Sequence, residues 1–287
     1  MNHVGIDVGG TKCHGVLVDE LGAILAEVRY PTPHASELVA LLESMFRELG
    51  GHATLGIGVP GLISHEGIVR ASPNLKGAHN TPVGPALRSS LGISVHVEND
   101  ATSAAFGEWQ VGAARGAQNA VMVTLGTGIG GGIVMGNVLH RGAHGFAGEI
   151  GHMVVERNGI QCPCGLRGCW ERYASGSALK HLSGGLSGED VFKAFHAGDE
   201  AAGAVIDTYA EWIAIGLASL TNICDPEIIV IGGGVVESFA GDLTVVTNHL
   251  AKELYSSDAR PHPRVVAASL GERAGAIGAA LLVSHNT

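Results

Sequence analysis

A strand pattern opens the chain. Val4, Ile6 and Val8 alternate with other residues over residues 3–8, and this period of two predicts a β-strand with one buried face. A glycine turn follows, and a second apolar run comes at residues 13–19. Together they predict a hairpin with a polar tip.

The same design returns in the middle of the chain. Residues 120–125 are apolar, residues 126–132 are rich in glycine, and residues 133–135 are apolar again, so a second hairpin is expected there. Two hairpins of one design suggest an internal duplication. Each turn would offer backbone N–H groups and a threonine hydroxyl to a phosphate, so one nucleotide could be gripped between two halves.

Further elements follow from periodicity and from cap signals. Apolar residues at helical spacing predict a helix over residues 36–49, capped by Ser36. Thr81 and Pro82 are expected to open a short helix as N-cap and first helical residue. The other expected elements are strands at 54–59, 93–97, 228–231 and 264–268, and helices at 101–111, 209–220 and 271–283.

Residues 148–171 hold the most specific chemical pattern, an H-x9-C-x-C-x4-C set. Its members are His152, Cys162, Cys164 and Cys169. These ligand types suit tetrahedral zinc, and one His with three Cys closes the coordination shell, so the metal would be structural. Glu149 and Glu171 bracket the set, so a metal that fixes the loop would also fix where both carboxylates point. The alternative is a disulfide pair, a spare thiol and an unrelated histidine.

The tip of the first hairpin is a candidate phosphate site. Gly9 and Gly10 let backbone N–H groups form an anion nest. Thr11 adds a hydroxyl and Lys12 a cation, and Asp7 can hold a magnesium ion through water. A Gly-Gly hairpin turn explains the glycines with no ligand at all.

A second candidate site lies at the junction of a strand and a helix. Glu98, Asn99 and Asp100 end one predicted strand immediately before the predicted helix. Open α/β sheets bind ligands at such carboxyl ends of strands. The alternative is that Asn99 or Asp100 only caps the helix.

Composition narrows the class of protein. The length of 287 residues favours about two domains, and the net charge of -10 argues against a nucleic-acid or anionic-membrane surface. The sequence contains no uninterrupted apolar run of about 18 residues, so a membrane-spanning helix is not expected. The N-terminus does not show the pattern of a signal peptide. Cys13 and Cys224 stand alone in apolar surroundings, which is typical of a cytoplasmic protein.

Taken together, these motifs resemble the ROK family of sugar kinases and repressors over nearly the whole chain. The motifs are residues 7–12, 98–100, 125–132, 148–152, 162–171 and 231–234. The resemblance implies an α/β, two-domain, actin-like (ribonuclease H-like) ATPase fold with the active site in the interdomain cleft. It implies a smaller domain at residues 1–115, completed by the helix at 272–287, and a larger domain with the zinc site at 116–271. Homodimers through the larger domain are common in the family.

The resemblance also implies roles for individual residues. Asp100 would be the catalytic base that takes the proton from the sugar 6-hydroxyl as it attacks the γ-phosphate of ATP. The other implied sugar contacts are Gly61, Asn74, Asn99, Glu149, His152 and Glu171. The implied contacts to ATP and Mg²⁺ are Asp7, Gly9, Gly10, Thr11, Lys12, Thr127, Gly128, Gly232 and Gly233.

The resemblance favours one substrate and leaves others open. Residues 170–176 look most like those of bacterial glucokinases, so D-glucose is the expected hexose. N-acetylglucosamine or N-acetylmannosamine kinases share the same catalytic set, and polyphosphate can replace ATP in some relatives. A ROK repressor would need a DNA-binding region before the first strand, which is expected to start near His3, so this alternative is disfavoured.

Overall fold

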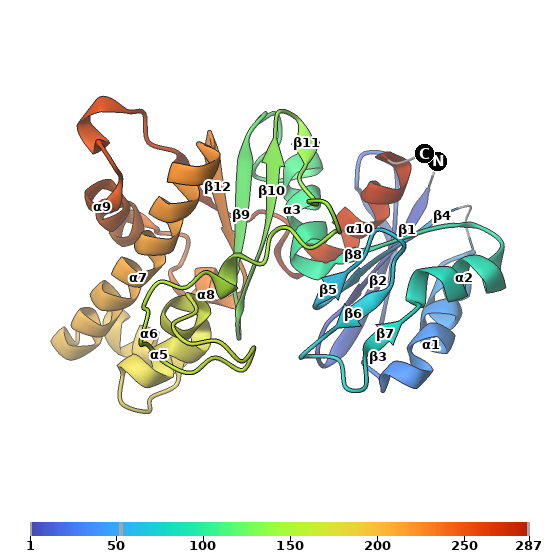
Figure 1. The fold of residues 1–287 in the computed structure, drawn as a ribbon, viewed down its shortest axis with the longest axis horizontal. Coiled ribbons are helices and arrows are strands. Elements are labelled where there is room, and N and C mark those ends of the chain that lie inside the picture. The colour runs from blue at the N-terminus through green and yellow to red at the C-terminus, as the bar shows by residue number, and fades with distance from the viewer. Residues whose placement is uncertain (1, 52–53, 286–287) are drawn as a thin grey trace. The chain divides into compact units, whose positions relative to one another are not determined.

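The computed structural model of the protein describes residues 2–51 and 54–285 (Figure 1). The chain forms two compact units. The first comprises Met1–Gly116, Leu139–Gly148 and Ser269–Thr287, and the second comprises Ala117–Val138 and Glu149–Ala268. The domain limits expected from the sequence stay a prediction. The first unit also includes the short segment 139–148, although the chain on both sides of this segment belongs to the second unit.

The first unit is built on a mixed sheet with the strand order β3-β2-β1-β4-β8. The strands β1 (His3–Val8), β2 (Lys12–Val18) and β3 (Ile24–Pro31) form an antiparallel meander. The strands β4 (Thr54–Val59) and β8 (Ser94–Asn99) continue the sheet in parallel with β1. The parallel strands therefore bring Asp7 and the Glu98–Asp100 motif to the same edge of the sheet.

The second unit repeats this topology, with the strand order β11-β10-β9-β12-β13. The strands β9 (Ala120–Leu125), β10 (Ile129–Met135) and β11 (Val138–Leu139) correspond to the first meander. The strands β12 (Ile228–Gly232) and β13 (Arg264–Ala267) pair in parallel beside β9. Both sheets use the same order of strands along the chain, as an internal duplication predicts.

Helices cover the first sheet at close range. Their bounds are α1 (Ala35–Glu48), α2 (Val83–Leu91), α3 (Asp100–Val111), the short turn η3 (Gly271–Arg273) and α10 (Ala274–His285). A Cβ atom on Gly5 of β1 would lie 2.0 Å from the backbone oxygen of Ala276, and one on Gly56 of β4 would lie 1.8 Å from that of Ala279. Only glycine therefore allows α10 to pack against these strands.

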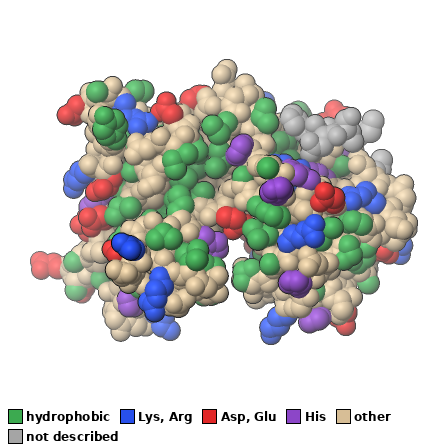
Figure 2. Space-filling model, viewed as in Figure 1, with side chains coloured by type: hydrophobic (Ala, Val, Ile, Leu, Met, Phe, Trp, Pro, Cys, Tyr) green, Lys and Arg blue, Asp and Glu red, His purple; other side chains and the backbone are tan. Residues whose placement is uncertain are grey.

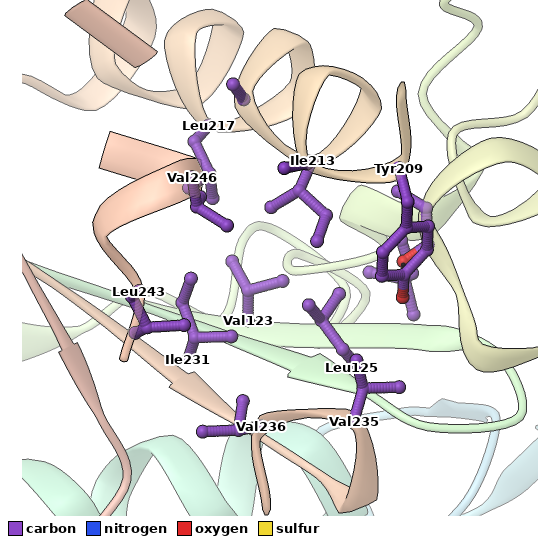
Figure 3. Packing of buried hydrophobic residues seen from close by; sticks show 14 of the residues in the cluster. Val123, Leu125, Tyr209, Ile213, Leu217, Ile231, Val235, Val236, Leu243 and Val246 are labelled. Atoms are coloured by element: carbon purple, nitrogen blue, oxygen red, sulfur yellow. Dashed lines mark hydrogen bonds between the residues drawn. The ribbon is translucent and has the colours of Figure 1, made fainter. Parts of the chain in front are cut away.

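The second unit has an apolar core between its sheet and a long helix. Its helical elements are η1 (Ile150–His152), α4 (Glu171–Ala174), α5 (Gly176–Leu182), α6 (Gly188–His196), α7 (Glu200–Cys224), α8 (Gly234–Ser238), α9 (Thr244–Glu253) and η2 (Ser257–Ala259). Val123 and Leu125 of β9 face Ile213 and Leu217 of α7 in this core (Figure 3). Helix α7 is long and apolar enough to cross a membrane, but it buries Tyr209, Ile213 and Leu217 in the core, as a core helix does.

Several local predictions need correction. Helix α1 is capped by His34 Nδ1, which accepts from the backbone N–H of Ser36, so Ser36 is not the cap. Pro82, rather than Thr81, is the N-cap residue of α2. The second glycine turn is shorter than expected because β10 already begins at Ile129. Glycine is common in turns, but it can also pair as a strand residue. A glycine-rich composition alone therefore does not distinguish a turn from a strand.

The first unit contains a small sheet that no pattern in the sequence predicts. It consists of β5 (Leu62–Ile63), β6 (Val69–Ala71) and β7 (His79–Thr81). These strands are too short for a period of two to be visible. The turn-rich segment at residues 72–75 lies between β6 and β7 and is irregular.

A buried carboxylate ties α3 to the chain that precedes α10. Glu108 is fully buried and accepts from the backbone N–H groups of Ala113 (2.7 Å), Ser269 (2.9 Å) and Leu270 (2.7 Å). The Ser269 hydroxyl donates to it as well, at 3.1 Å. Four donors satisfy the charge of a side chain that would otherwise be costly to bury. Glu108 therefore links α3 to the C-terminal segment of the first unit, which begins at Ser269.

Charges of both signs are spread over the surface. On the face shown in Figure 2, Lys and Arg side chains lie singly among Asp and Glu, with hydrophobic side chains between them. The whole chain carries a net charge of -10. The visible face therefore presents scattered charges of both signs rather than a continuous basic surface.

Candidate active site and metal centre

The four predicted metal ligands come together in the second unit. One ligand atom from each of His152, Cys162, Cys164 and Cys169 lies within 4.8 Å of the others. The Sγ atoms of Cys164 and Cys169 are 3.6 Å apart, and Cys162 Sγ is 3.9 Å from His152 Nδ1. Tetrahedral sulfur ligands are about 3.8 Å apart when each Zn–S bond is about 2.3 Å. The donor types, number and spacing therefore fit structural zinc.

The disulfide alternative does not hold, because the described cysteines are all free thiols. The Sγ–Sγ distance of 3.6 Å between Cys164 and Cys169 is far longer than the bond of about 2.05 Å in a disulfide. Burial is the largest cause that raises the pKa of the Cys162 thiol. A metal ion would offset this cost, since it binds the thiolate form.

Tight backbone turns place the ligands. The N–H of Cys162 donates to the Leu166 carbonyl oxygen at 2.8 Å, and the N–H of Gly165 donates to that of Cys162 at 3.1 Å. Gly168 has a φ of 76°, and a Cβ there would lie 1.7 Å from the Glu156 carbonyl oxygen. The turn between the cysteines therefore depends on glycine at Gly168.

The metal loop is anchored to the core through the residue after its last cysteine. Trp170 is fully buried, and its Nε1 donates to the Trp212 carbonyl oxygen of α7 at 2.7 Å. A Cβ on Gly216, one turn further along α7, would lie 2.0 Å from the indole ring. The glycine in α7 thus makes room for the tryptophan that fixes the loop.

Both bracketing carboxylates lie beside the metal cluster, as expected. Glu171 Oε1 is 3.1 Å from Cys162 Sγ and 3.9 Å from His152 Nδ1. Glu149 Oε2 is 3.9 Å from His152 Nε2. His152 thus turns Nδ1 toward the cysteines and Nε2 toward Glu149. A metal held by Nδ1 leaves Nε2 available to a substrate hydroxyl.

The second glycine turn meets the metal loop at Glu171. A Cβ on Gly128 would lie 2.7 Å from Glu171 Oε2. A side chain at Gly128 would therefore require the carboxylate end of Glu171 to shift, whether or not a phosphate also approaches. The turn is held by the N–H of Gly176, which donates to the Gly126 carbonyl oxygen at 2.7 Å, and by Ser177 Oγ, which donates to that of Thr127 at 3.1 Å.

In the first unit, Asp7 and Asp100 form a pair of close carboxylates. The pKa of Asp7 is raised to about 8, mainly by desolvation and also by the charge of Asp100, while the charge of Lys12 lowers it. Desolvation also raises the pKa of Asp100, while the hydrogen bond from the Ala101 N–H acts to lower it. Asp7 Oδ1 is buried and has no hydrogen-bond partner among the described residues. Such an orphaned, electron-rich oxygen fits the predicted magnesium site.

The helix cap beside Asp100 is Asn99. Its Oδ1 accepts from the Thr102 N–H at 2.9 Å, and its Nδ2 donates to the Gly61 carbonyl oxygen at 3.2 Å. Gly61 has a φ of 108°, and a Cβ there would lie 2.2 Å from the Ala71 carbonyl oxygen. Capping therefore accounts for Asn99 and leaves the carboxylate of Asp100 for another role.

The hairpin tip has the expected turn with an unexpected partner. The N–H of Gly9 donates to the Lys12 carbonyl oxygen at 2.9 Å, and a Cβ on Gly10 would lie 3.7 Å from the Asn74 carbonyl oxygen. Lys12 Nζ is 2.7 Å from Glu272 Oε2, and both side chains are exposed. Glu272 also pairs with Arg29 at 2.6 Å. No short motif predicts this cluster of Lys12, Arg29 and Glu272, because its members are far apart in the sequence.

The third glycine turn lies against the second hairpin. Gly233 has a φ of 88°, and a Cβ there would lie 2.4 Å from the Leu125 carbonyl oxygen. Gly232 ends β12, and helix α8 begins directly after Gly233. The turn is thus placed at the same sheet edge as Thr127 and Gly128.

Comparison with known proteins identifies the family. The profile of the ROK family matches residues 3–286. The chain belongs to the ROK family. The glucokinase of Streptomyces coelicolor is 35% identical in an alignment of 309 positions, which covers 96% of each chain. The xylose repressor of Bacillus subtilis is 31% identical over 297 residues, which cover 98% of this chain and 77% of the repressor.

A solved structure agrees with the fold of this ROK protein. The ROK family glucokinase of Streptomyces griseus, in complex with glucose and AMPPNP, matches with a TM-score of 0.87 and 34% identity. The match covers 99% of this chain and 100% of that one. The expected α/β, actin-like ATPase fold is therefore confirmed.

Proposed function

We propose that this ROK protein transfers the γ-phosphate of ATP to the 6-hydroxyl of D-glucose. The observation that carries the proposal is Asp100, a desolvated carboxylate at the start of α3 whose helix is capped by its neighbour Asn99. Desolvation favours the protonated form of a carboxyl, so Asp100 is suited to accept a proton from a bound hydroxyl. The similarity to glucokinases along both full lengths supports this role.

The remaining sugar contacts come from ordered acceptors. Glu149, His152 and Glu171 are held by the metal loop, and Asn99 and Gly61 are joined by a hydrogen bond. Asn74 lies beside Gly10 of the hairpin tip. A hexose carries several hydroxyls, and fixed acceptors bind it with less loss of conformational freedom than mobile ones.

The nucleotide contacts are two hairpin turns and the third glycine turn. Gly9, Gly10, Thr11 and Lys12 of the first turn, with Thr127 and Gly128 of the second, hold the phosphates, and Gly232 and Gly233 lie against the adenosine. When bound, Mg²⁺ neutralises phosphate charge, and Asp7 is the carboxylate placed to hold it. Phosphoryl transfer needs positioning and charge neutralisation more than covalent chemistry from the protein, which these turns can supply.

One coupled assay tests the proposal. Glucose, mannose, fructose, N-acetylglucosamine and N-acetylmannosamine are each offered with ATP or polyphosphate, and the formation of sugar phosphate is followed. We expect kcat/KM for glucose with ATP to exceed every other pair at least about tenfold, a difference of about 1.4 kcal/mol. If kcat/KM is higher with an N-acetylhexosamine, that sugar is the preferred substrate instead of glucose. If kcat/KM is higher with polyphosphate, polyphosphate is the preferred donor instead of ATP. No phosphorylation of any hexose would reject the kinase.

The protein acts in the cytoplasm as a homodimer that assembles through its second unit. Ile223 at the end of α7 is 73% exposed and Tyr255 after α9 is 76% exposed. Arg260 Nη2 pairs with Asp225 at 2.7 Å, so these two segments lie together. Large apolar side chains gathered on one face are typical of an interface.

Sedimentation equilibrium tests the dimer. Wild-type protein is expected to sediment at twice the chain mass, and Tyr255→Glu is expected to weaken the dimer at least tenfold, because it would bury a charge in the interface. Leu21→Glu is the matched control, since Leu21 is 78% exposed but lies in the first unit. A wild-type monomer, or equal effects of the two variants, would contradict this assembly.

A further inference from the structure

The segment 139–148 is attached to the first unit at three points. Arg141 forms an ion pair with Glu98. His65 Nε2 donates to the Gly142 carbonyl oxygen at 3.1 Å. Gly145 has a φ of 87°, and a Cβ there would lie 2.5 Å from the Ile63 carbonyl oxygen. No motif or periodicity in the sequence marks this segment, and the proposed kinase mechanism does not yet use it.

The ion pair is buried at the end of the strand that leads to Asp100. The side chain of Glu98 is 2% exposed and that of Arg141 is 20% exposed. Glu98 Oε2 faces Arg141 and lies 3.7 Å from His96 Nε2. Glu98 Oε1 accepts from the backbone N–H of Asn99 at 2.9 Å. One carboxylate thus connects a cation on one side with the backbone of Asn99 on the other.

The hydrogen bond to Asn99 bears on the geometry of the candidate site. The side chain of Asn99 caps α3 through Thr102 and reaches the carbonyl oxygen of Gly61. The N–H of Asn99 belongs to the peptide group between Glu98 and Asn99, and Asp100 is the next residue, so the position of this group affects how the chain enters α3 at Asp100. A hydrogen bond to an ionised carboxylate is shorter and stronger than one to a neutral acceptor. Glu98 therefore holds this peptide group best while it is charged.

A charge buried as deeply as Glu98 needs a counter-charge. The cost of desolvating a carboxylate is several kcal/mol, and loss of one partner from a buried pair leaves that cost uncompensated. The guanidinium of Arg141 supplies the counter-charge within the first unit. Without it, the buried Glu98 carboxylate would lack a counter-charge and would be driven to move toward water. This movement would weaken its hold on Asn99.

We propose that Arg141 is a positioning residue for phosphoryl transfer, which acts through Glu98 and Asn99 on the catalytic base Asp100. The proposal rests on the proposed kinase function. Arg141 itself does not need to touch either substrate. Its loss should lower kcat, since a base displaced by a fraction of an ångström transfers the proton poorly. The KM for ATP should change little, since the nucleotide turns are separate from this pair.

Arg141→Met tests the proposal, with Arg88→Met as the matched control. Arg88 lies against the same strand, where its guanidinium donates to the carbonyl oxygens of Val95 (2.9 Å) and Glu66 (2.7 Å), but it does not pair with Glu98. At a temperature well below each melting point, we expect Arg141→Met to lower kcat at least about thirtyfold and to change the KM for ATP less than about threefold. Arg88→Met should retain at least half of wild-type kcat even if its melting point falls.

Two further variants make the test decisive. In Glu98→Gln/Arg141→Met no charge is buried and an acceptor for the Asn99 N–H remains, so kcat should recover at least about fivefold over Arg141→Met. Arg141→Lys keeps a cation for Glu98, guards against loss of the fold, and should retain more than about a third of wild-type kcat.

The outcomes separate this proposal from the proposed function. If wild-type protein phosphorylates no hexose, the kinase itself is rejected. If wild-type protein is active, the role of Arg141 is overturned by any of three results: near-wild-type kcat in Arg141→Met, equal losses in Arg141→Met and Arg88→Met, or a folded Arg141→Lys as inactive as Arg141→Met. Failure of the double variant to recover overturns it as well.

Discussion

Replacing Asp100 by asparagine is expected to lower kcat by about 10²- to 10⁴-fold, which is the usual contribution of a general base. The amide keeps the size of the side chain and one acceptor oxygen, so the hydrogen bond from the Ala101 N–H can persist. It cannot take up the hydroxyl proton. Glucose affinity, measured by calorimetry, should therefore stay within about an order of magnitude of the wild-type value.

Asp199→Asn is the control for this substitution. Asp199 accepts from the Ala202 N–H at 2.8 Å as the N-cap of α7, and asparagine caps a helix about as well. The control should therefore keep its kcat. If Asp100→Asn retains a tenth of wild-type turnover, Asp100 is a structural residue of the helix start and the base must be sought elsewhere.

Loss of the metal is expected to raise the KM for the sugar by about two orders of magnitude or more. The metal loop orders Glu149, Glu171 and His152 together, and each hydrogen bond from a sugar to such a group is worth about 1.5 to 3 kcal/mol. Cys164→Ala removes one ligand, so elemental analysis should show the loss of about one zinc per chain. The KM for ATP should rise far less, because the proposed phosphate contacts lie on other turns.

Cys224→Ala is the control for the metal variant. Cys224 ends α7 and is not one of the four clustered ligands, so its loss should change neither the zinc content nor the KM for glucose. Wild-type protein purified without zinc, or a metal-free form with unchanged glucose affinity, would show that the cluster does not organise the sugar site.

Patterns within short stretches of sequence were enough to predict most of the fold. The alternation in residues 3–8 and the repeat of the hairpin at residues 120–135 predicted the hairpins on which both sheets are built. The H-x9-C-x-C-x4-C spacing predicted the cluster, because four ligands in one loop need little help from the rest of the fold. These signals are local, and the structure preserves them.

Contacts between distant residues could not be predicted in this way. The pair of Glu98 and Arg141 joins residues 43 positions apart, and the pair of Lys12 and Glu272 joins residues 260 positions apart. Each charged residue alone is compatible with an exposed position, so the sequence does not distinguish a paired one. The shielding of Asp7 Oδ1 likewise depends on packing, since Gly58 and Gly275 approach it from separate elements.

Cap positions were also unpredictable, for a different reason. His34, Pro82 and Asn99 are the N-cap residues of α1, α2 and α3. Each lies within two residues of another residue that could cap, and the free energies of such alternatives differ by about 1 kcal/mol. Tertiary contacts decide between them. For Asn99 the deciding contact is the hydrogen bond to the Gly61 carbonyl oxygen.

The position of the transferred phosphate on glucose tests the central claim most directly. Purified protein is incubated with glucose, ATP and Mg²⁺, and the product is identified by phosphorus and carbon NMR, with Asp100→Asn processed in parallel. We predict glucose 6-phosphate as the sole phosphorylated sugar from wild-type protein and none from the variant over the same time. A phosphate on another hydroxyl, an unmodified sugar, or equal product from both proteins would contradict the account.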